Sequence, residues 1–259
     1  MESFLKGPKV RSLTKRLEQR LQIIGKMSLT FDLVKKVFRL CAFGVMNRKD
    51  SSWCSLLEDD DVSIMQYQGD LETYYEHSYG NQLNLKMECT LLSKITKNLR
   101  DFSTGQTDLR GVFRFTSSST VVKLLTILGL LKDSVPLRAD NYLQMSKREF
   151  VTSNNYGSYV GQYRCGFVPC NSSRMAGKLD HKVQVLVNGE PVALPCCHGN
   201  VTCNLDKFLS CFKEIVDSCD LDTICSLPST DQSKAMASKL NPQQILLSFI
   251  PGFTFLFRV

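Results

Sequence analysis

A short turn rich in hydroxyl side chains is the strongest candidate for a ligand site in this sequence. In the segment VFRFTSSSTVVKLL, a strand-like run containing Phe113 and Phe115 leads into three serines and a threonine at 117–120, and an apolar helix follows. A helix N-terminus attracts anions such as phosphate, because its N–H groups are free and its dipole is positive there. Serine and threonine are also preferred N-caps. No side chain of the turn exchanges a proton near neutral pH, so the turn predicts phosphate binding but not phosphate removal.

The three histidines offer little alternative chemistry. His77 has Glu and Tyr neighbours in a predicted helix and His181 precedes a predicted strand, so both are expected to be structural. His198 lies in PCCHGNVTC, where the spacing of Cys and His permits a zinc site. A disulfide is favoured there, and we expect no metal and no cofactor. Phosphate-binding loops, dinucleotide-binding motifs, nucleophile elbows and H-E-x-x-H are all absent from the sequence.

Eleven cysteines are many for 259 residues, and most of them lie in the C-terminal half. Two N-glycosylation acceptors, Asn171 and Asn200, lie among them. This composition is typical of an oxidising compartment, which predicts the secretory pathway. The first residues, MESFLKGPKVRSL, lack the apolar core of a signal peptide. Compartment chemistry and targeting therefore point in different directions.

Two disulfides are predicted from spacing. Cys219 and Cys225 enclose the five-residue loop DLDTI, which predicts a short-loop disulfide. Cys203 is expected to pair with either Cys196 or Cys197, and the sequence leaves that choice open.

The formal charge of +7, from 32 basic and 25 acidic residues, favours polyanionic partners in general. Leu13, Leu17, Leu21 and Ile24 mark an amphipathic helix with a basic face. We interpret that face as solvated, and we expect no nucleic-acid partner.

The order of elements suggests a helical layer followed by a mixed α/β layer. Up to about residue 107 we expect helices, among them one over 30–43 and one that begins at the acidic run 58–61 and ends near 77. Beyond this point the pattern predicts a strand, a helix, a further strand, a hairpin that turns at Asn188-Gly189, and a last helix. The expected ranges are 111–116, 119–132, 158–168, 181–195 and 205–217.

The C-terminal tail has two interpretations. ILLSFIPGFTFLFRV follows a polar spacer with small residues, an arrangement that resembles a GPI-attachment signal. Pro251 and Arg258 favour a tail without that role. No stretch reaches the length of a membrane span, so a membrane is expected only if the tail is such a signal.

Several separated segments, in order, resemble the multiple inositol polyphosphate phosphatases of the histidine acid phosphatase superfamily. They include FLKGPKV, YYEHSYGNQLN, LLTILGLLKDSVPLRADNY and VLVNGEPVALP. The resemblance implies an α/β fold: part of a histidine-phosphatase α/β domain with a helical inserted domain, the opening N-terminal strands being missing. Residues 1–107 would belong to the helical domain, 108–228 would close the α/β domain, and 229–259 would form the tail. A partner chain could then complete the sheet.

The same resemblance implies a metal-independent hydrolysis of inositol phosphates through a phosphohistidine. The family's nucleophile motif, R-H-G-x-R-x-P, has no counterpart in this sequence. A second family pattern, like LRFAHAET, aligns without gaps on FRFTSSST, where Arg114, Phe115 and Thr120 match. Ser117 then replaces the histidine, and Ser119 replaces the acid that protonates the leaving group.

The alignment leaves no catalytic residue intact. The expected substrate-binding residues are Arg114, Ser117, Ser118, Ser119 and Thr120, and their expected ligands are inositol phosphates or other phosphomonoesters. We therefore expect a truncated, catalytically inactive relative of the phosphatases. The alternative is a non-catalytic module that binds inositol phosphates or a partner protein.

Overall fold

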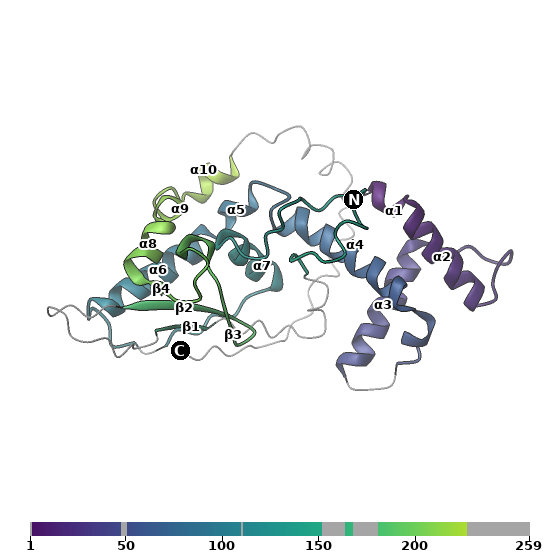
Figure 1. The fold of residues 1–259 in the computed structure, drawn as a ribbon, viewed down its shortest axis with the longest axis horizontal. Helices are drawn as coiled ribbons and strands as arrows, with labels where there is room; N and C mark the ends of the chain where they lie inside the picture. The colour runs from purple at the N-terminus through teal and green to yellow at the C-terminus, as the bar shows by residue number, and fades with distance from the viewer. Residues whose placement is uncertain (1, 48–50, 110, 152–163, 168–180, 227–259) are drawn as a thin grey trace. The chain divides into compact units, whose positions relative to one another are not determined.

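The computed structural model describes residues 2–47, 51–109, 111–151, 164–167 and 181–226. In these ranges helices dominate, with one small sheet (Figure 1). The elements in chain order are α1 (Glu2–Leu5), α2 (Pro8–Arg20), α3 (Phe31–Met46), η1 (Cys54–Leu56), α4 (Asp59–His77), α5 (Asn84–Met87), α6 (Cys89–Ser103), α7 (Ser118–Ile127), β1 (Arg164–Phe167), β2 (Lys182–Val187), β3 (Glu190–Val192), η3 (Pro195–Cys197), β4 (Cys203–Asn204), α8 (Leu205–Cys211), α9 (Lys213–Asp217) and α10 (Leu221–Cys225).

Contacts divide the chain into two compact units. Unit 1 comprises 1–85 and 117–161, and unit 2 comprises 86–116 and 162–259. This division differs from the sequence-based boundary near residue 107. Helix α7 packs against α4 and so joins the first unit, whereas α6 packs against α9 in the second. The local sequence pattern identifies a helix, but it does not show in which compact unit that helix packs.

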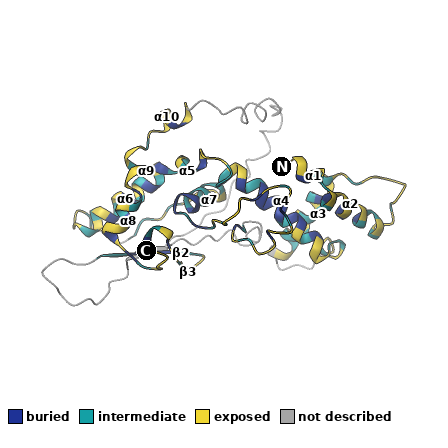
Figure 2. Ribbon diagram, turned by 45° about the horizontal axis from the view of Figure 1, so that its top comes forward, coloured by how far each residue is buried: buried dark blue, intermediate teal, exposed yellow. Residues whose placement is uncertain are grey.

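Helix α4 is the centre of unit 1. Nine of its residues are buried, and Figure 2 shows dark blue along much of its length. The neighbouring helices each contribute apolar side chains from one face. The spacing of the apolar residues along α2 predicts such a face for that helix. The core of unit 1 consists of Phe4, Val10, Leu13, Leu17, Val34, Ile64, Met65, Tyr67, Leu71, Tyr74, Leu137, Met145 and Phe150.

Two buried carboxylates on α4 tie other segments to it. Asp61 accepts hydrogen bonds from Arg16 Nε at 3.0 Å and from Arg20 at 2.5 Å. Asp70 is fully buried and pairs with Arg148, whose Nε donates to it at 2.8 Å. A buried charge needs such partners, because desolvation otherwise costs several kcal/mol. The acidic run at 58–61 begins a helix, as predicted, and Asp61 also accepts from the Glu58 N–H at 3.2 Å.

A buried asparagine organises the loop that covers α4. Asn141 Oδ1 accepts from the Tyr67 hydroxyl at 2.8 Å and from the Arg138 N–H at 2.9 Å. Its Nδ2 donates to the Pro136 carbonyl at 2.9 Å. Burial raises the pKa of Tyr67 to about 12, although the positive charge of Arg148 acts in the opposite direction.

The sheet of unit 2 is antiparallel throughout. Its order is β1-β2-β3, with β4 on β2. The predicted hairpin is confirmed: Val187 pairs with Glu190, and Asn188 and Gly189 have φ values of 53° and 87°. Two positive φ values are what a type I′ turn requires. The helix expected over 205–217 is present as α8 and α9, with Phe212 between them.

Two predictions around the hydroxyl-rich turn are wrong. Residues 111–116 form no strand. Helix α7 begins at Ser118 and ends at Ile127, short of the expected 132. Gly129, at φ 78°, follows the helix, and the Leu130 N–H bonds to the Leu125 carbonyl at 2.9 Å. This Schellman-type ending stops the helix although the following residues are apolar.

Three disulfides are present among the described residues: Cys41–Cys54, Cys89–Cys219 and Cys197–Cys203. The predicted Cys219–Cys225 pair is not formed, and Cys225 is exposed and unbonded. The packing of α9 on α6 brings Cys219 to Cys89, with 5.6 Å between their Cα atoms. For Cys203, the structure selects Cys197 from the two partners left open.

Candidate functional site

The hydroxyl-rich turn lies at the N-terminus of α7, in unit 1. Ser117 is the residue before the first helical one, with φ −78° and ψ 161°. Its hydroxyl oxygen lies 2.8 Å from Ser119 Oγ and 3.3 Å from Thr120 Oγ1. Ser117 and Ser118 are exposed, and Ser119 and Thr120 are half-buried. Ser117, Ser119 and Thr120 therefore form a small hydroxyl cluster at the start of the helix, and Ser118 lies beside them in the sequence.

The expected side-chain cap is absent. Ser117 occupies the N-cap position, but its hydroxyl accepts no hydrogen bond from the N–H groups of the first turn, because it bonds instead to neighbouring hydroxyls. The first N–H groups of a helix have no acceptor within the helix itself. Together with the helix dipole, they leave this end of α7 suited to an anion.

Lys123 in α7 and His77 at the end of α4 influence the charge around this helix. Lys123 is one turn beyond Ser119, and residues four apart lie on the same side of a helix. Burial lowers the pKa of His77, and the positive charge of Lys123 lowers it further. His77 Nδ1 is buried without a hydrogen-bond partner in the described part of the chain. The surroundings of α7 thus favour a neutral imidazole beside a positively charged ammonium.

The cluster contains no group suited to proton transfer at neutral pH. Ser117 and Ser119 offer hydroxyls, and a general acid or base works best with a pKa near the working pH. Arg114 lies in the segment leading to α7, and its side chain is half-buried. The chemistry available at the turn is therefore hydrogen bonding and charge attraction.

The sequence analysis identified neither Lys123 as a neighbour of the turn nor His77 as a neighbour of Lys123. The position of Lys123 could have been found, since its four-residue spacing from Ser119 places both on one side of a helix. The proximity of His77 could not, because it depends on how α4 packs against α7.

The other candidate residues lie apart from this turn in the sequence. His198 is exposed, with φ 59°, and the Cys197–Cys203 disulfide occupies two of the four ligands that a zinc site with His198 would need. Asn200 is exposed, and its Nδ2 donates to the Cys197 carbonyl at 3.0 Å. Asn171 and the tail at 229–259 are outside the described residues. Within the described residues, every helix is too short or too polar to cross a membrane.

Comparison with known proteins gives one family. Residues 2–188 match the histidine phosphatase superfamily (branch 2). Multiple inositol polyphosphate phosphatase 1 of Gallus gallus is 27% identical over 242 residues, which are 91% of this chain and 53% of that protein. The Homo sapiens protein of the same name is 27% identical over 88% of this chain and 47% of its own length. For the Drosophila melanogaster protein the values are 26%, 71% and 38%. The chain spans about half the length of the first two relatives.

Proposed function

The chain belongs to the histidine phosphatase superfamily (branch 2), and from this premise we propose that it holds phosphomonoesters at the N-terminal turn of α7 without hydrolysing them. The ligand class proposed is the inositol phosphates, because the similar proteins of Gallus gallus and Homo sapiens are multiple inositol polyphosphate phosphatases. The observation that carries the proposal is the hydroxyl cluster of Ser117, Ser119 and Thr120, at the position where the family pattern has a histidine and an acid.

Binding at this turn would use three kinds of contact. Phosphate oxygens would accept hydrogen bonds from the free N–H groups of the first turn of α7 and from the hydroxyls of Ser117 and Ser119. Lys123 would contribute a positive charge one turn further along. Inositol hexakisphosphate carries several phosphate groups, so its attraction to a chain of net charge +7 would weaken as salt increases.

Hydrolysis would fail at this turn because no residue can supply the leaving group with a proton. Ser119 would stand where the family acid stands, and a serine hydroxyl gives up its proton far above neutral pH. Ser117, in the position of the family histidine, likewise offers only a hydroxyl. The turn would keep its affinity for phosphate and lose the proton transfer.

Calorimetry with inositol hexakisphosphate tests the binding step. We expect heat of binding at low ionic strength, weaker binding as salt increases, and a loss of about tenfold in affinity in Lys123→Gln, since one charge-assisted contact contributes roughly 1.4 kcal/mol or more. Lys147→Gln is the matched control, because Lys147 is an exposed lysine of the same unit outside α7. Absence of binding at low ionic strength, or equal losses in both variants, would refute the proposed site.

We further propose that the protein resides in an oxidising compartment of the secretory pathway. Three disulfides support this location, since such bonds persist where thiols are not kept reduced. The exposed acceptor Asn200 is consistent with it. Digestion of the native protein with a glycosidase specific for N-linked glycans tests this part: a drop in mass is expected, and an unchanged mass would contradict glycosylation at Asn200.

A further inference from the structure

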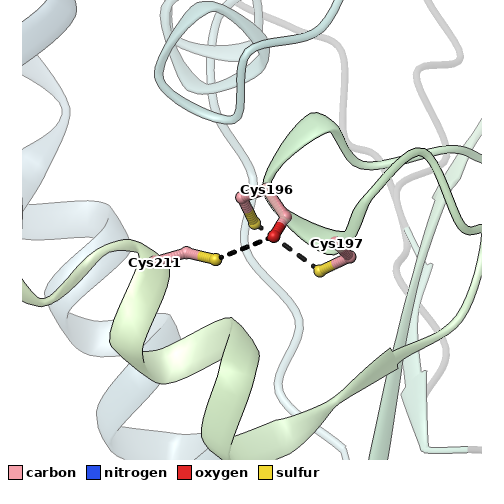
Figure 3. Close-up of side chains that lie close together, drawn as sticks. All are labelled: Cys196, Cys197 and Cys211. Carbon is pink, nitrogen blue, oxygen red and sulfur yellow. Dashed lines mark hydrogen bonds between the residues drawn. The ribbon is translucent and has the colours of Figure 1, made fainter.

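Two unbonded cysteines lie beside the disulfide of the sheet in unit 2. The Sγ atoms of Cys196, Cys197 and Cys211 all lie within 4.8 Å of one another, and Cys197 is bonded to Cys203 (Figure 3). Cys196 Sγ is 3.5 Å from Cys197 Sγ. The Cys211 thiol donates to the Cys196 carbonyl at 3.4 Å, so its side chain points toward η3. Four cysteines of η3, β4 and α8 therefore lie together, and two of them are already joined in a disulfide.

We propose that Cys196 and Cys211 are a redox-active pair that closes into a second disulfide and joins η3 to α8. The two helices already pack against each other. A disulfide brings its sulfur atoms to about 2.05 Å, so closing the present separation of no more than 4.8 Å requires side-chain rotation and a small approach of the two helices. The neighbouring Cys197–Cys203 bond holds η3 against β4, so Cys196 presents its thiol to α8 from a fixed segment.

Closure requires an oxidant, and glutathione disulfide is sufficient. The Cys211 thiolate attacks one sulfur of glutathione disulfide and releases a glutathione thiolate, which takes up the proton lost by Cys211. The Cys196 thiolate then attacks Cys211 Sγ in the mixed disulfide, forms the Cys196–Cys211 bond and releases the second glutathione. Two protein thiols are oxidised by two electrons, and one glutathione disulfide is reduced to two thiols.

The surroundings of Cys196 determine how fast the pair closes. Burial raises the pKa of the Cys196 thiol to about 12, and its hydrogen bond with Cys211 acts in the same direction. Because the thiolate is the attacking species, the second step is slow at neutral pH and speeds up by about tenfold for each pH unit. The closed pair also removes both thiols of this cluster that could hold a metal ion, since the third sulfur, that of Cys197, is already bonded to Cys203.

Peptide mapping with trypsin tests the pair, because tryptic cleavage places Cys196 and Cys211 on different peptides. Lys182, Lys207 and Lys213 bound two peptides, 183–207 with Cys196, Cys197 and Cys203, and 208–213 with Cys211 alone. After incubation with glutathione disulfide, alkylation and digestion without reductant, we expect 208–213 to appear only as a cross-linked product with 183–207. Fragmentation should place the link on Cys196. Cys225 should remain alkylated, since it is exposed and has no partner among the described cysteines.

Serine variants separate the pair from its neighbours. Cys196→Ser and Cys211→Ser should each abolish the cross-link and leave the Cys197–Cys203 bond intact, whereas the matched control Cys225→Ser should leave the cross-link unchanged. The proposal is overturned if both thiols remain alkylated under conditions that oxidise glutathione-sensitive controls, or if the link joins Cys211 to Cys197. Zinc retained by the protein with no cross-link would also overturn it.

Discussion

Replacing Asp61 by asparagine should destabilise unit 1 substantially. Asp61 is completely buried at the first turn of α4, where Arg16 and Arg20 both donate to it. Asparagine keeps the size and one acceptor oxygen but presents N–H groups to a guanidinium. Breaking a buried ion pair from one side costs about 3–5 kcal/mol. The side chains of Arg16 and Arg20 remain 30% and 21% exposed and can regain water, so we expect a loss of about 2–3 kcal/mol.

Urea unfolding of the two variants Asp61→Asn and Asp60→Asn isolates this loss. Asp60 lies in the same helical turn and is exposed, so its replacement changes the formal charge and the interaction with the helix dipole equally. Its expected cost is no more than about 1 kcal/mol. Equal losses in the two variants would refute the reasoning, because the ion pairs would then contribute nothing beyond the dipole.

The pH dependence of this loss provides a second check. Burial alone would raise the pKa of Asp61, but hydrogen bonds from Arg20, Arg16 and the Glu58 N–H outweigh it and hold the pKa below its ordinary value. A lowered folded pKa stabilises the protein above the unfolded pKa of about 3.9, and the contribution is lost as pH falls through the folded pKa. The difference between wild type and Asp61→Asn should be constant from about pH 7 to 5 and shrink below about pH 4.

Three further predictions concern single side chains. Tyr67→Phe should cost about 1–2 kcal/mol in urea unfolding, because it removes two hydrogen bonds of a buried hydroxyl; Tyr142→Phe, which keeps its ring contacts, should change stability by less than about 0.5 kcal/mol. Cys89→Ser opens a disulfide that spans 130 residues and should lower the free energy of unfolding by about 3–5 kcal/mol. Cys225→Ser removes an unbonded thiol and should have no such effect. Equal losses in the two variants would contradict the Cys89–Cys219 pairing. In His77→Gln, the free energy of unfolding should depend less on pH between about 7 and 5. Burial and Lys123 lower the pKa of His77 in the folded protein, so the wild type loses stability as the imidazole of the unfolded chain takes up a proton. An unchanged slope of stability against pH would refute this role of His77.

Local elements were the most predictable part of this fold. The helix that begins at the acidic run 58–61 and the hairpin at Asn188-Gly189 depend on residues close together in the chain, where caps and turn types dictate the backbone. The strand at 111–116 was predicted wrongly, since alternating apolar residues indicate only a tendency to be extended and the structure assigns no strand there. The early end of α7 depends on Gly129, which the continuous apolar run concealed.

Long-range partners could not be found from spacing. Cys219 lies six residues from Cys225 in the sequence. Because α9 packs on α6, however, Cys219 forms its disulfide with Cys89, 130 residues away. The ion pairs of Asp61 with Arg16 and Arg20 likewise link residues more than 40 apart. At the candidate site, the residue types of 117–120 favour an anion site without acid–base groups, and that site stays a prediction. The bonding of Ser117 to its neighbouring hydroxyls, instead of to the helix N–H groups, could not be found from the sequence.

The most direct test of the account is a phosphorus-31 NMR spectrum of inositol hexakisphosphate recorded over time with the purified chain at low ionic strength. We expect the phosphate resonances to broaden or shift on addition of protein, and to do so less with Lys123→Gln. No resonance of inorganic phosphate should grow beyond that of a protein-free sample. Growth of inorganic phosphate would contradict the claim that Ser117 and Ser119 have replaced the hydrolytic groups. Unchanged resonances at every protein concentration would contradict binding at the turn of α7.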